Sequence, residues 1–401
     1  MKDFFSFLKH NAREVSFGWV LTFLSSFGQT FLISLYVPEI LKAFAISEGT
    51  FGGIYAICTI TASIIMLTVG HSVDHKPVKT VTALTVLGAA ISCFLLGISH
   101  YHIVLLFVAV TGLRLTGQGW MTHISMTVMS RYYDSDRGKA LSIAALGYSI
   151  GEAFFPIIIS TLILWYDYEV AAMASGGFLL LYLVRLYFVN LSHFDNQIEE
   201  KHKPSTKTLV QDYRKILSEK KFYIMMPASI VIAFTITSFL FYQYVFVEEK
   251  EWSVTLYASF FTAYAITRFA MTILSGFLVD KFTAKRLFRV YLLPISIGLL
   301  PLALMDSIIG ALLFLILAGV SVGASSSITT AVIAELYGVE RLGVIRSLYT
   351  MFVVLSTALG PFLVGLLLDA DIDFTWIILG LFFITVASLI NAQRIKGVSR
   401  V

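Results

Sequence analysis

Arginines inside apolar stretches are the residues of this chain with the clearest chemical meaning. Arg268 lies near the middle of the stretch 259–281, Arg114 is central in an earlier apolar segment, and Arg185 lies close to the end of another. A guanidinium stays charged at physiological pH and presents donors that match a carboxylate or a phosphate. Because holding this charge within a membrane is costly, such an arginine usually faces a cavity and has a partner. Arg268 therefore raises the prediction of a site for an anion, whereas Arg185 can extend to the membrane surface.

Two further ionisable residues within apolar segments are candidates for moving protons. Glu152 lies in the middle of its segment, where a carboxyl group can carry a proton or serve as a structural partner for Arg114 or Gln118. The sequence favours neither role. His123 can titrate near neutral pH, although a packed, hydrogen-bonded histidine is the commoner case. Glu152, His123 and Arg114 are thus the candidates for proton coupling.

No pattern of residues indicates catalysis, a metal site or a cofactor. The two cysteines, Cys58 and Cys93, lie in apolar runs and suggest neither a disulfide framework nor metal ligands. No nucleotide-binding glycine loop precedes a basic residue. The sequence predicts a protein that is not an enzyme and that uses ion or solute gradients rather than ATP.

The composition places these residues in a membrane protein. Hydrophobic residues make up 57% of the 401 residues and charged residues only 13%, whereas a soluble chain has about 25% charged residues. The mean hydropathy is +0.83, and only lipid can cover so much apolar surface. The net charge of +4 is therefore no sign of nucleic-acid binding.

Apolar segments long enough to cross a bilayer, at about 20 residues each, recur along the whole chain. A polar stretch separates six of them from six more, which predicts an N-terminal half (1–190), a cytoplasmic linker (191–221) and a C-terminal half (222–401). The fold class is all-α integral membrane. The twelve predicted spans are 16–38, 50–70, 79–98, 103–130, 139–163, 167–190, 222–246, 255–279, 286–305, 308–334, 343–367 and 374–394.

The distribution of charge predicts the orientation. Most Lys and Arg residues fall in the connections on one side, which the positive-inside rule makes cytoplasmic, together with both termini. We expect a multi-pass protein of the cell membrane, the inner or plasma membrane. The linker reads as an amphipathic helix on the inner membrane surface or as a solvated tether, with apolar residues at Leu209, Val210, Tyr213, Ile216 and Leu217.

An internal repeat relates the two halves. Two halves of six helices related by a parallel repeat are typical of secondary transporters, with the substrate site between the halves. The matched features are Gly70 to Asp74 with Gly276 to Asp280, Tyr133, Asp136 and Arg137 with Tyr337, Glu340 and Arg341, and Pro156 with Pro361.

With these motifs in view, the chain resembles a major facilitator superfamily transporter over nearly its whole length. That family carries G-x-x-x-D-[RK]-x-G-x-[RK]-[RK] after its second helix, and partial copies begin at Gly70 and Gly276. In the first copy His75 and Pro77 replace the expected basic residue and the second glycine, and in the second copy Thr283 replaces that glycine. The resemblance implies that these loops gate the cytoplasmic side, through Asp74, Lys79, Asp280 and Lys281.

Shorter motifs resemble the monocarboxylate transporter and oxalate–formate antiporter branch. Glu14 to Trp19 is similar to the monocarboxylate signature entering the first helix, and Tyr132 to Gly151 to the signature entering the fifth. Arg114-Leu-Thr-Gly117-Gln118-Gly119 resembles the Arg…Gly-Gln-Gly run of the bacterial members. Glycines at four-residue spacing also let membrane helices approach closely, so these motifs indicate family rather than substrate.

The resemblance also implies a substrate site. Arg268 occupies the position of the family's anion-pairing arginine, whereas Tyr264 stands where proton-coupled members commonly have an aspartate. In helices expected to line the cavity, Gln29, Tyr242 and Tyr349 are further candidates for binding the substrate.

We therefore expect a secondary active transporter of small organic anions, with a monocarboxylate as the leading substrate. It would act as a monomer by alternating access, through proton symport or anion exchange. One alternative is an efflux pump for a larger amphiphile, in which Arg268 would be a structural pair. Another is a transport-inactive membrane sensor.

Overall fold

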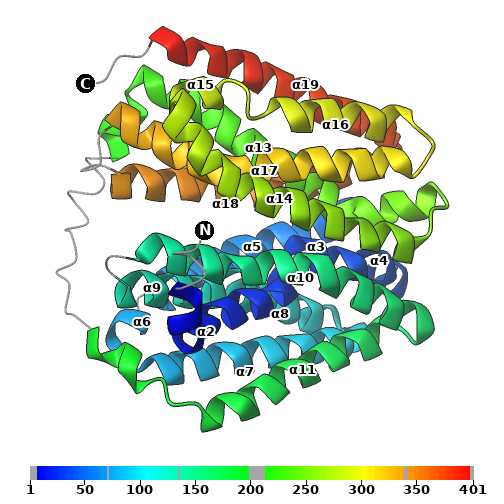
Figure 1. Cartoon of the computed structure of the whole chain (residues 1–401). Coiled ribbons are helices and arrows are strands. Elements are labelled where there is room, and N and C mark those ends of the chain that lie inside the picture. Colours follow the sequence, from blue (N-terminus) through cyan, green and yellow to red (C-terminus); the bar gives the residue numbers. More distant parts are fainter. Residues whose placement is uncertain (1–6, 70–71, 134–135, 198–212, 338–341, 398–401) are drawn as a thin grey trace. The chain divides into compact units, whose positions relative to one another are not determined.

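Long apolar helices make up the fold, as expected for a chain whose backbone must satisfy its own hydrogen bonds in lipid. The computed structural model describes residues 7–69, 72–133, 136–197, 213–337 and 342–397, and every regular element in these ranges is helical (Figure 1). Eleven helices are long and apolar enough to cross a membrane, and a bent pair, Ala12–Gly28 with Thr30–Phe44, brings the number to twelve. The predicted all-α membrane fold is confirmed.

The chain forms two compact units. The first comprises Met1–Ile46 and Ile54–Lys201, and the second comprises Ser47–Gly53 and His202–Val401. The first unit contains α2 (Ala12–Leu24), η1 (Ser25–Gly28), α3 (Thr30–Ile33), η2 (Ser34–Tyr36), α4 (Val37–Phe44), most of α5 (Glu48–Val69), α6 (Ser72–His75), α7 (Val78–Gly97), η3 (Ser99–Tyr101), α8 (Ile103–Leu113), η4 (Arg114–Met121), α9 (Thr122–Tyr132), α10 (Arg137–Trp165), α11 (Tyr168–Phe188) and η5 (Ser192–Gln197). The second contains α13 (Lys220–Glu249), α14 (Val254–Phe282), α15 (Ala284–Phe288), α16 (Leu293–Leu304), α17 (Ile309–Tyr337), α18 (Leu342–Asp369), α19 (Phe374–Ala392) and η6 (Gln393–Gly397).

Glycines allow the closest helix contacts within the first unit. α10 packs along α2, and α7 packs against α8 and α11 (Figure 1). A Cβ atom on Gly147 would collide with the backbone of Trp19, and one on Gly151 would collide with Ser26. The two backbones therefore approach each other as small-residue spacing permits in membrane helices.

Glycines also allow close helix contacts in the second unit. α14 packs along α17, and α16 packs against both α17 and α19 (Figure 1). A Cβ atom on Gly319 would lie 2.8 Å from the carbonyl oxygen of Tyr264 and 3.1 Å from the amide nitrogen of Arg268. α14 is therefore held against α17 where the membrane arginine occurs.

The middle of the predicted linker, residues 198–212, falls outside the described residues. Its beginning is the short helix η5, and residues 213–217 near its end are helical. Leu209 and Val210, which were part of the predicted amphipathic pattern, lie in the range 198–212 that the structure does not describe.

Candidate functional site

The first spanning segment is interrupted at Gln29. The 3-10 turn η1 ends at Gly28, Gln29 has an extended backbone (φ −86°, ψ 151°), and helix resumes at Thr30 with a bend of 43°. The side chains of Gln29 and Thr30 are both buried. Interrupted membrane helices expose backbone polar groups at their broken ends, and transporters use such ends to bind substrates and ions.

A second irregularity lies directly against the first. Residues Arg114–Met121 form the π-helix η4 between α8 and α9, and such wide turns occur frequently at functional sites. η4 packs on η1, and a Cβ atom on Gly117 would lie 2.6 Å from both the Cα and the nitrogen of Gly28. The two distorted segments are thus in backbone contact.

Arg114 sits at this contact with a buried charge. Its side chain is 3% exposed, and one guanidinium nitrogen donates to the Gly28 carbonyl at 3.4 Å and to the Thr30 hydroxyl at 3.3 Å. The guanidinium carbon is 5.0 Å from the centre of the Tyr55 ring, and the Tyr55 and Thr30 hydroxyls are 2.8 Å apart. We call Gly28, Thr30, Tyr55 and Arg114 the Arg114 cluster.

The partners of Arg114 in this cluster are neutral. In the described part of the chain no carboxylate lies within ion-pair distance of its guanidinium, and its Nε atom has no hydrogen-bond partner there. A buried charge that meets only neutral groups is costly. The cluster therefore has spare capacity to bind an anion.

The two other candidates for proton coupling belong to the same unit. Glu152 is buried on α10, 3% exposed, and its role as a proton carrier or as a structural partner of Arg114 or Gln118 stays a prediction. Two glycines that precede it on this helix, Gly147 and Gly151, hold α10 against α2. His123 is half-buried in the first turn of α9.

In the second unit Arg268 lies halfway along α14 and is half-buried. Its guanidinium carbon is 6.0 Å from the centre of the buried Tyr264 ring, one turn earlier on the same helix. The backbone of Arg268 is fixed by the glycines of α17, since a Cβ atom on Gly323 would meet its carbonyl group. Arg268 and Tyr264 are therefore close to each other on α14, and their role in binding the substrate stays a prediction.

Tyr242 and Tyr349 are buried within the same second unit. The Tyr242 hydroxyl donates to the Glu48 carbonyl at 2.6 Å, and Glu48 belongs to that unit. The Tyr349 ring meets Phe222 edge-on with 5.6 Å between centroids. Its hydroxyl has no hydrogen-bond partner among the described residues. Both rings contribute to packing, and their role in binding stays a prediction.

Of the predicted gating residues, the structure describes the side chains of the two lysines. Lys79 donates to the Tyr187 carbonyl at 2.7 Å, which ties α7 to α11 within the first unit. The Lys281 ammonium lies 5.3 Å from the centre of the Phe282 ring. The side chains of Asp74 and Asp280 lie outside the described part of the structure.

Sequence reasoning missed Tyr55 and the helix interruption. Tyr55 carries no local signal, because a tyrosine in an apolar helix is usually packing or part of the interface belt. The polar triplet Gly28-Gln29-Thr30 in an otherwise apolar span was an available signal for the break. Among the described residues no three His, Cys, Asp or Glu side chains gather as metal ligands.

Comparisons with known proteins agree with this architecture. Two solved structures of a bacterial homolog of the human lysosomal transporter Spinster share the fold. The inward-facing, unoccupied form has a TM-score of 0.72 at 15% identity and covers 95% of this chain and 94% of its own. The inward-facing, occupied form has a TM-score of 0.71 at 15% identity and covers 96% and 95%.

No curated protein sequence matches the chain significantly. At the level of sequence families, residues 18–308 and, in a second match, residues 246–395 fit the description "Major Facilitator Superfamily". These matches extend over most of the chain and include both units. The chain therefore belongs to the major facilitator superfamily.

Proposed function

We propose that this transporter carries a small organic anion by alternating access, and that monocarboxylates are the first substrate class to test. It would do so as a monomer, with both termini in the cytoplasm. Family membership supports membrane transport of a small molecule. The substrate class rests on Arg114 and Arg268 and on the branch-level motifs in the sequence.

The observation that carries the proposal is the charge of Arg114. Its guanidinium is buried at a helix interruption and has only neutral partners among the described residues. Pairing with a carboxylate would neutralise the charge and would use the fork-shaped donor set that suits planar anions. The same guanidinium would bind an uncharged solute with no such gain, so the cluster favours an anion.

The direct test is uptake of radiolabelled acids into proteoliposomes containing the purified protein. We expect saturable flux of at least one monocarboxylate, with competition among lactate, pyruvate and oxalate resolving the preferred acid. If none of these acids is carried or competes, while a bulky amphiphile is, the efflux alternative replaces the proposal. A protein that moves neither class of compound would support the sensor alternative.

Arg268 is the second arginine proposed to bind the substrate, and its two replacements are expected to lower uptake to different extents. Arg268→Gln is expected to lower uptake by about tenfold or more, because one charge-assisted hydrogen bond is worth about 1.5–3 kcal/mol. Arg268→Lys keeps the charge but loses the fork and should retain partial flux. Uptake rates measured at several substrate concentrations would check this order. Equal transport by parent and both variants would exclude Arg268 from substrate binding.

Glu152 is the proposed proton carrier. A carboxyl group buried in a membrane helix is a recurring element of proton relays in transporters. In Glu152→Gln we expect substrate exchange to persist while accumulation driven by an inward proton gradient is lost. Alkalinisation of the outside medium on substrate addition, read with a pH electrode, should disappear in the same variant. If the variant still alkalinises the medium like the parent, Glu152 does not carry the proton.

A further inference from the structure

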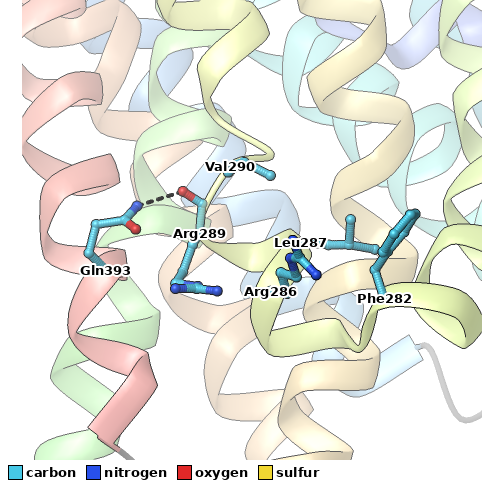
Figure 2. Close-up of a pocket in the computed structure, with 6 residues that line it drawn as sticks. All are labelled: Phe282, Arg286, Leu287, Arg289, Val290 and Gln393. Carbon is cyan, nitrogen blue, oxygen red and sulfur yellow. Dashed lines mark hydrogen bonds between the residues drawn. The ribbon is translucent and has the colours of Figure 1, made fainter.

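A surface pocket of about 290 Å³ lies in the second unit, at the ends of three membrane-spanning segments. The span of α14 ends here at Val279, the span of α19 and η6 ends here at Ile395, and the span that includes α15 and α16 begins at Ala284. Figure 2 shows Arg289 and Arg286 between Gln393 on one side and Phe282 on the other. The pocket is lined by Phe282, Arg286, Leu287, Arg289, Val290 and Gln393.

The charged groups of this pocket are all positive. Arg286 and Arg289 are its ionisable lining residues, and in the described part of the chain neither has a carboxylate within ion-pair distance. The Arg286 guanidinium carbon lies 5.7 Å from the centre of the Phe282 ring, and the Gln393 amide donates to the Arg289 carbonyl at 2.6 Å. Both guanidinium groups therefore keep donors available for an anion.

At the corresponding position in the first unit, the start of the third predicted span, a carboxylate of the chain itself is bound. There the third predicted span begins with α7, and its Val78 amide donates to the Asp195 carboxylate at 2.8 Å. Asp195 belongs to η5, which follows the sixth helix of that half. In the second unit η6 follows α19 and contributes Gln393 to the pocket, while the Ala284 amide is bound by Glu335 of α17 at 3.0 Å. Among the described residues no carboxylate lines this pocket.

Apolar side chains lead from the pocket along the membrane face of α16. Val290, at the edge of the pocket, is 50% exposed, and Leu293 and Ile297 are 45% and 50% exposed. Leu293 and Ile297 are four residues apart and therefore lie on one face of the helix. In a spanning helix an exposed apolar face contacts acyl chains. A ligand of this pocket can thus place a charged end beside the arginines and an apolar end along α16.

From this arrangement we propose that the pocket binds the phosphate of an acidic phospholipid headgroup. Two guanidinium groups supply forked donors for phosphate oxygens, and the uncharged amide of Gln393 adds no repulsion. A soluble phosphate shares this recognition chemistry but gains nothing from Val290, Leu293 and Ile297. The proposed site is separate from the Arg114 cluster and does not depend on the identity of the transported substrate.

Native mass spectrometry of the detergent-purified protein tests the proposal, with phosphatidylglycerol as the acidic lipid and phosphatidylcholine as the zwitterionic one. We expect the double variant R286Q/R289Q to lower the affinity for phosphatidylglycerol by about 30-fold, because each of the two basic residues contributes about 1 kcal/mol near an acidic lipid and a factor of ten corresponds to about 1.4 kcal/mol. Phosphatidylcholine occupancy should not change. The matched control, R214Q/K215Q, removes two exposed charges elsewhere in the second unit and should bind phosphatidylglycerol like the parent.

A thermal-shift series separates the two sources of phosphate and checks folding. All variants should melt close to the parent without lipid, since the substituted side chains lie at the surface. Phosphatidylglycerol should raise the Tm of the parent and of the control but not of R286Q/R289Q. The proposal is overturned by equal phosphatidylglycerol binding in all three proteins, or by equal loss in the control. Greater stabilisation by glycerol 3-phosphate than by the lipid would assign the pocket to a soluble phosphate.

Discussion

Replacing Arg114 by glutamine should abolish most transport without lowering the stability of the protein. The lost charge-assisted hydrogen bonds to an anionic substrate are worth about 1.5–3 kcal/mol each, or about 10- to 100-fold in flux. The parent protein, by contrast, holds a buried charge among neutral groups, namely Gly28, Thr30 and Tyr55. Removing such a charge relieves a desolvation cost. We therefore expect a Tm equal to or above that of the parent.

Initial rates of uptake and melting curves on the same preparation check this prediction. Arg185→Gln is the matched control, because Arg185 is also an arginine of a spanning helix but is exposed on α11. It should transport and melt like the parent. A fall in Tm of several degrees in Arg114→Gln would contradict the prediction and would make Arg114 a brace for the interrupted helix, with the loss of flux as a secondary effect.

Adding a single methyl group at Gly117 should disrupt the contact between the two irregular segments. The Cβ atom of Gly117→Ala would lie 2.6 Å from the Cα and nitrogen of Gly28. Backbone atoms cannot turn aside as a flexible side chain can, so η4 and η1 must separate. Overpacking of this kind costs about 1–3 kcal/mol. We expect a lower Tm and a loss of transport, because the separation displaces Arg114 from Thr30.

Gly119→Ala is the control for this experiment. Gly119 belongs to the same π-helix, but its added Cβ atom would meet its nearest neighbours at ordinary distances, 3.5 Å from the Arg114 carbonyl oxygen and 3.6 Å from the Met66 sulfur. The variant should retain both stability and flux. If the two alanine variants behave alike, the effect arises from glycine content in η4 and not from the contact with Gly28.

Much of the fold was predictable because the membrane imposes it. An apolar segment that is long enough to cross a bilayer has to be helical. Hydropathy alone was therefore enough to predict the twelve spans. Prolines did not mislead this prediction: Pro156 and Pro361 lie inside α10 and α18, which continue through them. Membrane helices tolerate such residues because neighbouring groups satisfy the freed backbone positions.

The candidate site was only partly predictable, because its parts come from different helices. The ionisable residues Arg114, Glu152 and Arg268 were evident from their rarity in apolar segments. The partners of Arg114 were not, since Gly28 and Tyr55 are ordinary residues whose importance depends on the packing of η1 against η4. A hydropathy profile also cannot show a π-helix, which changes the hydrogen-bond register but not the composition.

The glycine motifs had two meanings in the sequence, and the structure shows one of them directly. Gly147 and Gly151 resembled a family signature, and they also had the spacing that lets helices approach. In the structure they bring α10 onto α2, and Gly117 brings η4 onto Gly28. The resemblance to the monocarboxylate branch stays a prediction, because close packing accounts for these glycines in any member of the superfamily.

The interruption at Gln29 has a mechanical consequence for the first span. An unbroken helix behaves as one stiff rod, so a rotation at one end is passed to the other. Here the extended residue Gln29 separates α2 from α3 and α4, so no continuous helix couples the two parts of the span. The interruption lies next to Arg114, whose guanidinium donates hydrogen bonds to Gly28 before Gln29 and to Thr30 after it. Any ligand that draws the guanidinium away would break both of these hydrogen bonds at once.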